Sequence, residues 1–361
     1  MNLINEFDNI DLSLKLLEEI KKRATKEVRI MEVCGTHTRS IYKYGIDKLL
    51  PSNVKILSGP GCPVCVTSQS YIDSAIEVSK KKNVIITTFG DMMRVPGSLS
   101  SLRDEKAKGS DIRVIYSPLD SLEIAKNNKE NEVVFLAIGF ETTAPVIALT
   151  LKMAKLEKID NFTMIHSIKT MPNTMKTLVL NEVVNIDGFI APGHVATIIG
   201  EEVFNKLAKE SRTPMSICGF KSTEILAGIL SIINMVNNNE VRCENLYKGF
   251  VKKEGNIIAK KLMNEVFVPS DSVWRGIGNL EGTGYIFKEE YEMFDAKLKF
   301  SLNIKEEIIN NGCICGDILK GKKSPRECKL FGKHCNPNNP IGPCMVSQEG
   351  TCGIVYNHRI S

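Results

Sequence analysis

The eleven cysteines are the residues of this sequence most able to do chemistry, and they are unevenly distributed. Six lie late in the chain, at Cys313, Cys315, Cys328, Cys335, Cys344 and Cys352. A second, earlier group consists of Cys34, Cys62 and Cys65, while Cys218 and Cys243 are isolated. Isolated cysteines usually act as small buried hydrophobic residues. The two groups are therefore the candidates for metal binding or redox chemistry.

The late group contains four cysteines spread over loops rich in proline and glycine. They are Cys328, Cys335, Cys344 and Cys352. Four convergent thiolates suit zinc or an iron–sulfur cluster, and the spacing matches neither the paired motifs of common zinc fingers nor the usual ferredoxin patterns. Both metals stay open on the residues alone, and Cys313 or Cys315 could replace one ligand. Residues 312–353 also have little apolar mass, so a metal centre would supply the cross-links that a core cannot.

The early group contains a CxxC motif at residues 62–65. In a reducing compartment, such a motif acts as a redox dithiol or supplies half of a zinc site. Cys34 ends a neighbouring predicted strand, so it can approach this motif. His37, three positions later, could lower the thiol pKa or act as an acid or base. We expect Glu141 and His194, from similar loops further along the chain, to join it.

Eight short β-branched runs, each followed by a helical pattern, must position these residues. They are Val28–Val33, Val54–Leu57, Val84–Thr88, Arg113–Tyr116, Val133–Ile138, Thr163–His166, Gly188–Ala191 and Met215–Cys218. This alternation is typical of parallel βαβ units. The first four runs resemble the second four at an offset of roughly 100 residues, which indicates an internal duplication.

The pattern predicts an α/β protein with two duplicated parallel-sheet domains, at residues 28–130 and 131–240, flanking a cleft. The ligand site should lie at the carboxyl ends of the strands. Residues 1–27, with an amphipathic helix, and 241–361 are expected to form a smaller helical and irregular domain around the tail metal centre, an iron–sulfur domain where that centre is a cluster. The apolar face of that helix consists of Leu12, Leu16, Leu17 and Ile20. No strand-end loop has a nucleotide-binding glycine motif.

The charge and the hydropathy of the chain disfavour nucleic-acid-binding, secreted and membrane-spanning classes of protein. The 361 residues, enough for about two or three domains, carry a net charge of +5 with both signs mixed along the chain, which does not favour nucleic-acid binding. The first residues lack a secretory signal pattern, and no apolar run approaches the ~18 residues of a membrane span. We expect a cytoplasmic protein without a membrane partner, in which thiols stay reduced.

The motifs together resemble the HypD family of hydrogenase maturation factors over nearly the whole chain. They are CGTHT from residue 34, GPGCPVC from 59, GFETTAP from 139, PGHVATIIG from 192, WRGIG from 274, EYEMFDAKLKF from 290 and GKKSPREC from 321, followed by FGKHC, NPIGPCMVS and EGTC. The chain departs from the family at Asn279, Leu280, Thr283 and in CGFKSTEIL from 218.

The resemblance implies assembly of the Fe(CN)2CO centre of nickel–iron hydrogenases. Family members hold iron together with a small HypC chaperone, receive cyanide through HypE and HypF, and contain a [4Fe-4S] cluster. By position, Cys34 would bind the iron, Cys62 and Cys65 would be a dithiol or disulfide, and Cys328, Cys335, Cys344 and Cys352 would hold the cluster. We expect a monomer that forms transient complexes.

Two other functions compete with this one. A thiol-disulfide oxidoreductase of the ferredoxin-thioredoxin-reductase kind would use the cluster to reduce the Cys62 and Cys65 pair. A zinc-stabilised interaction scaffold would have no redox role.

Overall fold

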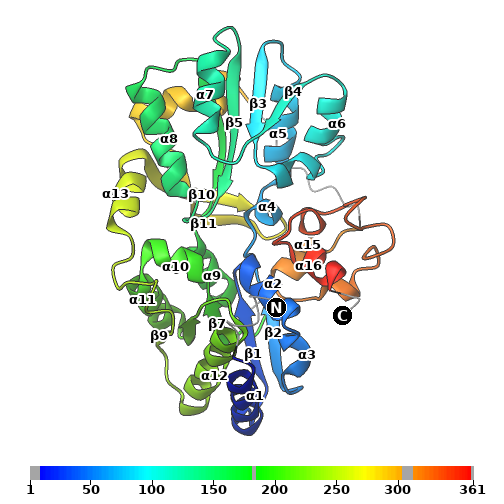
Figure 1. The fold of residues 1–361 in the computed structure, drawn as a ribbon, viewed down its shortest axis with the longest axis vertical. Coiled ribbons are helices and arrows are strands. Elements are labelled where there is room, and N and C mark those ends of the chain that lie inside the picture. Colours follow the sequence, from blue (N-terminus) through cyan, green and yellow to red (C-terminus); the bar gives the residue numbers. More distant parts are fainter. Residues whose placement is uncertain (1–8, 181–183, 303–311, 359–361) are drawn as a thin grey trace.

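Two parallel β-sheets, an antiparallel hairpin between them and a C-terminal tail make up the computed structural model (Figure 1). The structure describes residues 9–180, 184–302 and 312–358. Sheet A has the order β2-β1-β7-β8-β9, with β1 (Val28–Glu32), β2 (Val54–Ser58), β7 (Gly188–Ala191), β8 (Met215–Ile217) and β9 (Cys243–Asn245). Sheet B has the order β4-β3-β5-β6, with β3 (Val84–Thr88), β4 (Asp111–Val114), β5 (Glu132–Gly139) and β6 (Phe162–Ile168). The hairpin pairs β10 (Phe267–Trp274) with β11 (Gly278–Phe287).

Helices cover the sheets and connect their strands. In chain order they are α1 (Ile10–Arg23), α2 (Gly35–Lys43), α3 (Ile46–Leu49), α4 (Pro63–Val66), α5 (Gln69–Ser79), α6 (Leu102–Ala107), α7 (Asp120–Asn127), α8 (Ala144–Leu156), α9 (Met171–Leu180), α10 (Gly193–Ile199), α11 (Glu201–Ser211), α12 (Ser222–Asn238), α13 (Ile257–Val266), α14 (Ala296–Lys299), α15 (Cys315–Leu319) and α16 (Thr351–Asn357). Short 3-10 turns are η2 (Gly90–Arg94), η3 (Glu289–Phe294), η4 (Pro325–Glu327) and η5 (Pro343–Met345).

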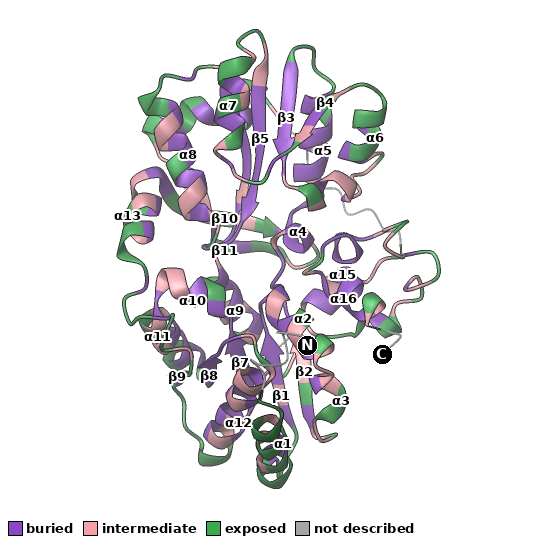
Figure 2. Cartoon of the chain, viewed as in Figure 1, coloured by how far each residue is buried: buried purple, intermediate pink, exposed green. Residues whose placement is uncertain are grey.

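All eight predicted strands are present, and β9, β10 and β11 are additional. Every strand pair in sheets A and B is parallel, which confirms the α/β class. Helices lie on both faces of the sheets, so the central strands are apolar along their length rather than alternating. β3 is buried at every position and β5 at all but its first (Figure 2).

The predicted division between residues 28–130 and 131–240 does not hold for the sheets. Sheet A combines β1 and β2 with β7, β8 and β9, and sheet B contains β3 to β6. The chain therefore crosses between the sheets after β2 and again after β6. Sequence offsets reveal which segments are alike, whereas the choice of pairing partner depends on tertiary packing that a pattern does not contain.

The strand orders nevertheless agree with the repeat. The repeat matches β1 to β4 with β5 to β8, in that order. Replacing each strand by its match turns the order β2-β1-β7-β8 of sheet A into β6-β5-β3-β4, which is the order of sheet B read from its other edge. Each of the two similar segments, β1 to β4 and β5 to β8, would thus contribute two strands to sheet A and two to sheet B. The duplication itself stays a prediction.

The predicted third domain also changes. The helix expected within residues 1–27 is α1, and its Leu17 and Ile20 are buried while Leu12 is exposed. Lys26 Nζ donates to Val236 O at 3.1 Å, and α1 packs along α12, so this segment belongs with sheet A. From the other predicted segment, β9 joins sheet A and α13 packs on α8. Residues 1–8, 303–311 and 359–361 of this prediction lie outside the described residues.

The tail lies beside the junction of the two sheets, next to α2 and α4 (Figure 1). Arg94, at the end of η2, donates from Nη1 to Pro337 O at 3.0 Å and from Nη2 to Val346 O at 3.3 Å. Thr36 Oγ1, in α2, donates to Glu349 Oε1 at 3.2 Å. The tail is thus held by both sheets. In the part of the chain that the structure describes, no helix is long and apolar enough to cross a membrane.

Candidate metal and thiol centre

Cys34 lies between the end of β1 and the start of α2, where it is the N-cap residue and 8% exposed. Burial raises the pKa of its thiol to about 12, although the backbone N–H groups of His37 and Thr36 favour the thiolate. A thiol in this position stays protonated at neutral pH unless a cation replaces the proton. The site therefore suits a metal ligand better than a free nucleophile.

Glu32 holds this loop, and sequence reasoning did not find it. Its Oε2 accepts the backbone N–H of Cys34 at 3.1 Å, and its Oε1 accepts the Thr38 hydroxyl at 2.6 Å. Burial raises the pKa of Glu32 to about 7. The available signal was a carboxylate at the end of an otherwise apolar strand.

The CxxC motif forms the first turn of α4, after β2. The sulfur atoms of Cys62 and Cys65 are 2.6 Å apart, and the Cys65 backbone N–H donates to Cys62 Sγ at 3.3 Å. The two side chains are 3% and 0% exposed. A small movement would bring the sulfurs to the ~2.05 Å of a disulfide bond. The predicted dithiol geometry is therefore present.

Two glycines of the GPG sequence bring the early thiol loops together. Gly59 N–H donates to Glu32 O at 2.7 Å, and Gly35 N–H donates to Gly61 O at 3.2 Å. A Cβ atom on Gly61 would lie 2.3 Å from the backbone nitrogen of Cys34. The Cys34 loop thus packs directly against the residue that precedes Cys62, as the expected approach of these thiols requires.

His37 and His194 come together because both contact the Phe220 ring. The centroid of the Phe220 ring lies 4.6 Å from that of His37 and 4.1 Å from that of His194. His37 Nε2 donates to Gly219 O at 3.0 Å, whereas its Nδ1 has no hydrogen-bond partner among the described residues. Burial lowers the pKa of His37 to about 4 and also lowers the pKa of His194. Both imidazoles are neutral at pH 7, so either can accept a proton or bind a metal.

Glu141 does not join these histidines. It follows β5 in sheet B, where its Oε1 accepts the Met171 backbone N–H at 2.9 Å. Its charge acts on Tyr285, and burial raises the pKa of Glu141 to about 7. No contact in the described part of the chain links it to His37 or His194. The prediction assumed that the strand-end loops of both segments share one cleft. Glu141 instead follows a strand of sheet B, at the position that corresponds to His37 in the predicted repeat.

Cys218 is an unforeseen neighbour of the site. It is fully buried, as expected of an isolated cysteine, but it follows β8 and its Sγ lies 3.8 Å from His37 Nε2. Its position at the end of a predicted strand was the signal that could have placed it here.

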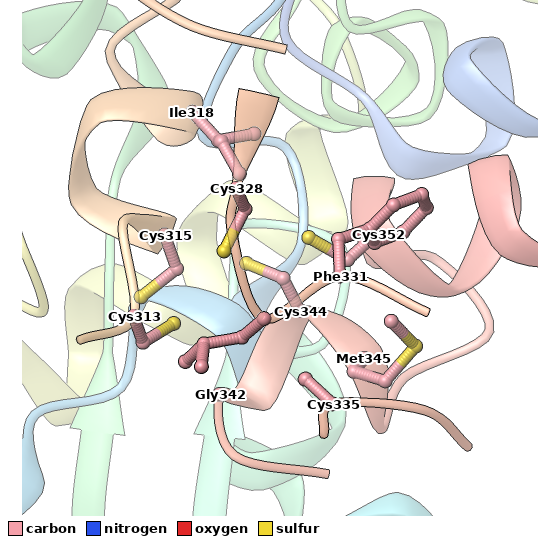
Figure 3. A pocket seen from close by; sticks show the side chains of 11 residues that line it. Cys313, Cys315, Ile318, Cys328, Phe331, Cys335, Gly342, Cys344, Met345 and Cys352 are labelled. Atoms are coloured by element: carbon pink, nitrogen blue, oxygen red, sulfur yellow. The ribbon is translucent and has the colours of Figure 1, made fainter. Parts of the chain in front are cut away.

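The late cysteines surround one small cavity, and Figure 3 shows the sulfurs of Cys328, Cys344 and Cys352 turned toward one another. All six of them line it, and the other lining residues are Ile318, Leu330, Phe331, Gly342 and Met345. In the part of the chain that the structure describes, no three His, Cys, Asp or Glu side chains converge closely enough to hold one metal ion. Thiols around an apolar cavity fit a multi-iron cluster, which spans a wider donor set than a single ion does.

Cys344 connects the two groups of thiols. Its side chain interacts with Cys65 on one side and with Cys315 on the other. The thiol of Cys352 acts on Cys344 and also lies under the influence of Cys313, Cys335, Cys315 and Cys328. Sulfur atoms therefore follow one another from the CxxC motif into the tail, and Cys344 faces the dithiol.

Arg275, in the WRGIG turn of the hairpin, is a second residue that sequence reasoning did not single out. Its backbone N–H donates to Val66 O at 2.9 Å, and its Nη2 donates to Gln69 Oε1. Its charge acts on Cys313 and Cys315. The hairpin thus places a guanidinium between the helix of the dithiol and the tail cysteines.

Known proteins resemble this chain along almost its full length. The family model described as HypD, hydrogenase formation hypA family, matches residues 11–359. A Methanocaldococcus jannaschii protein named for hydrogenase expression and formation is 43% identical over 347 residues, which cover 96% of each chain. The hydrogenase maturation factor HypD of Escherichia coli is 38% identical and covers 99% of this chain and 98% of its own. HypD of Azotobacter vinelandii is also 38% identical, over 99% and 96% of the two chains. Sequence resemblance and full-length similarity agree, and the chain belongs to the HypD family.

Proposed function

We propose that this protein is a maturation factor for nickel–iron hydrogenases, on which the Fe(CN)2CO group is assembled. A HypC-type chaperone would share the iron, and a HypE-type protein would donate cyanide. The observation that carries the proposal is the position of the Cys62 and Cys65 dithiol, which lies between the Cys34 loop and the tail thiols. The reducing cytoplasm suits this chemistry.

Iron is the cargo of this site, and Cys34 is its proposed ligand. The chain provides one thiol, with neutral imidazoles nearby, and the described residues include no set of three donors for one ion. Soft thiolate donors suit the low-spin ferrous iron that cyanide and carbon monoxide favour. The remaining ligands must come from the diatomic groups and from a partner, which supports a scaffold shared with a small chaperone.

The Cys62 and Cys65 pair can store two electrons. Closing the bond between their sulfurs releases two electrons and two protons, and reopening it takes both back. Both side chains are buried, so a protein disulfide cannot reach them without a change of structure. This burial argues against the ferredoxin-thioredoxin-reductase type of function, whose substrate is external.

The tail fits a [4Fe-4S] cluster held by Cys328, Cys335, Cys352 and one further thiol. Cys344 is the predicted fourth ligand, and its sulfur turns toward those of Cys328 and Cys352 (Figure 3), while Cys313 and Cys315 line the same cavity and could replace it. When bound, such a cluster supplies single electrons at low potential. The apolar cavity wall excludes water from the thiols.

Infrared spectra of the protein purified anaerobically with a HypC-type partner test the function. We expect cyanide and carbonyl bands from the natural chain and none from Cys34→Ala, with the visible absorption of the cluster unchanged. The matched control is Cys243→Ala, a buried cysteine of β9, which should keep the bands. Bands that persist in Cys34→Ala would remove this residue from the mechanism.

Metal analysis tests the cofactor and its ligands. We expect iron and sulfide, and they should be lost in Cys328→Ser and in Cys344→Ser but retained in Cys313→Ser. Loss in Cys313→Ser with retention in Cys344→Ser would make Cys313 the fourth ligand instead. One zinc without iron or sulfide would favour the interaction scaffold.

A further inference from the structure

The net charge of the chain is concentrated in one short segment of the tail, residues 320–334. Six of the 47 Lys and Arg residues and one of the 42 Asp and Glu residues fall in it, so this segment alone carries the whole net charge of +5. The remaining residues are balanced at 41 of each sign. The mixed charge along the chain therefore conceals one basic segment.

Most cations of this segment face solvent, and they form no ion pairs with described acidic side chains. Five of its basic side chains are exposed, namely Lys322, Lys323, Arg326, Lys329 and Lys333. None of them forms an ion pair with any other residue that the structure describes. The one acid, Glu327, accepts the Ser324 backbone N–H at 2.6 Å and so caps η4. The segment presents a positive surface without ion pairs, although Arg326 acts on Asp47 and Lys323 on Glu327 through longer-range electrostatics.

This positive surface adjoins one of the two partly exposed tail thiols. Of the six cysteines that line the tail cavity, Cys313 and Cys328 are the two that are not buried. Cys328 lies in the middle of the basic segment, between the exposed side chains of Arg326 and Lys329. A redox partner must approach a cofactor closely, and a partner bound to the basic segment would lie over Cys328, whereas Cys313 borders a separate pocket beside Arg275.

We infer that residues 320–334 are the docking surface for a small acidic protein that carries single electrons. The inference rests on the proposed cluster. One electron passes from the reduced carrier, which becomes oxidised, to the bound cluster, which becomes reduced, and no bond forms or breaks. Opposite charge on the two proteins raises the rate of productive encounter.

The composition of the segment disfavours its other uses. Nucleic-acid grooves combine cations with exposed aromatic rings on which bases stack, whereas the one aromatic residue here, Phe331, is buried. Membrane-surface segments combine cations with exposed apolar side chains, and no large apolar side chain of this segment is among the exposed ones. A folded acidic protein is the occupant that such a surface fits.

Stopped-flow reduction of the cluster tests the inference. The probe is a chemically reduced acidic ferredoxin, and the variant is Arg326→Glu with Lys329→Glu. The matched control is Lys206→Glu with Lys209→Glu on α11, which lies at the opposite edge of the molecule (Figure 1). At low salt, we expect the second-order rate to fall about tenfold in the variant and to stay within about twofold in the control. High salt should slow the natural chain toward the variant.

The outcomes separate two failures. Dithionite should reduce the cluster of all three proteins equally, which shows that the substitutions leave the cofactor intact. A cluster present in every protein, with an unchanged ferredoxin rate in the variant, would overturn the docking surface alone. Absence of iron and sulfide from the natural chain would overturn the cluster and the docking surface together. Binding of an RNA oligomer at the same salt, without reduction by ferredoxin, would also overturn the inference.

Discussion

Sheets A and B have equivalent strand orders, but the loops at the carboxyl ends of their strands carry different side chains. Around sheet A, the loops supply thiols and imidazoles, at Cys34, Cys62, Cys65, His37 and His194. Around sheet B, they supply oxygen atoms and border a cavity of about 520 Å³, with Asp91, Thr142 and Thr143 in its wall. The architecture brings strand-end loops together in both places, and the residue types alone make one of them a thiol site.

The repeat makes this comparison specific to single positions. When residue 28 is aligned with residue 132, His37 corresponds to Glu141, and Cys34 corresponds to Ile138. When residue 54 is aligned with residue 163, Cys65 corresponds to Thr174. The members of each pair occupy corresponding positions in the predicted repeat, so exchanging chemistry at one member tests the function, and the other member serves as a control.

The largest expected effect is at Cys65 and its counterpart Thr174. Cys65→Ser keeps the shape of the side chain but removes the dithiol, so we expect complete loss of the cyanide and carbonyl infrared bands with the fold retained. Thr174→Ser keeps the hydroxyl that donates to Thr170 O at 3.0 Å, so it should retain them. Infrared spectra and circular dichroism check both. Bands in Cys65→Ser would show that electrons reach the iron without this pair.

The second effect concerns His37, whose pKa burial lowers from 6.5 to about 4. The unfolded chain takes up a proton below pH 6.5, and the folded chain does so only near pH 4. The free energy of unfolding should therefore fall by up to about 3 kcal/mol as the pH drops through this window. In His37→Gln, which can still donate to Gly219 O, that dependence should vanish. Urea unfolding at pH 4 to 7 measures it, and equal slopes in both proteins would contradict a buried neutral imidazole.

Glu141, at the corresponding position, should make the free energy of unfolding depend on pH in the opposite direction. Burial raises its pKa from 4.5 to about 7, so the folded chain keeps a proton that the unfolded chain loses above pH 4.5. The free energy of unfolding should fall by up to about 3 kcal/mol as the pH rises from 4.5 to 7. Glu141→Gln should remove this loss and gain stability relative to the natural chain across that range. A variant that loses relative stability toward pH 7 would mean that the carboxylate is ionised and stabilising.

The strands and the thiol loops could be predicted from the sequence because their signals are local. A β-branched run followed by glycine and a helical pattern contains its own end, so Cys34, His37 and the CxxC motif could be placed at strand termini. The family resemblance added a proposed role for the tail cysteines, which stays a prediction. These features need no knowledge of which strand pairs with which.

The rest depends on contacts between distant residues. Glu32 matters because its carboxylate turns back onto the Cys34 backbone, and Cys218 matters because β8 lies two strands away from β1 in sheet A. Arg275 reaches Gln69 from a hairpin some 200 residues later. The exchange of strands between the sheets has the same origin. The same duplicated sequence is compatible with sheets formed within each segment and with sheets formed between the two segments.

The smallest expected effect is at Gly61, where sheet B has Thr170 at the corresponding position. A Cβ atom on Gly61 would lie 2.3 Å from Cys34 N and 2.5 Å from Val33 C, which are backbone atoms that cannot move aside easily. We expect Gly61→Ala to cost about 1–3 kcal/mol in urea unfolding. The control is Gly249→Ala, which has no atom within 4 Å of its Cβ and should change stability by less than about 0.5 kcal/mol. Because the strain falls on the Cys34 loop, Gly61→Ala should also weaken the infrared bands, whereas Gly249→Ala should not. Equal stability of the two variants would show that the thiol loops of sheet A do not require close packing, and the contrast with Thr170 would then have no structural cause.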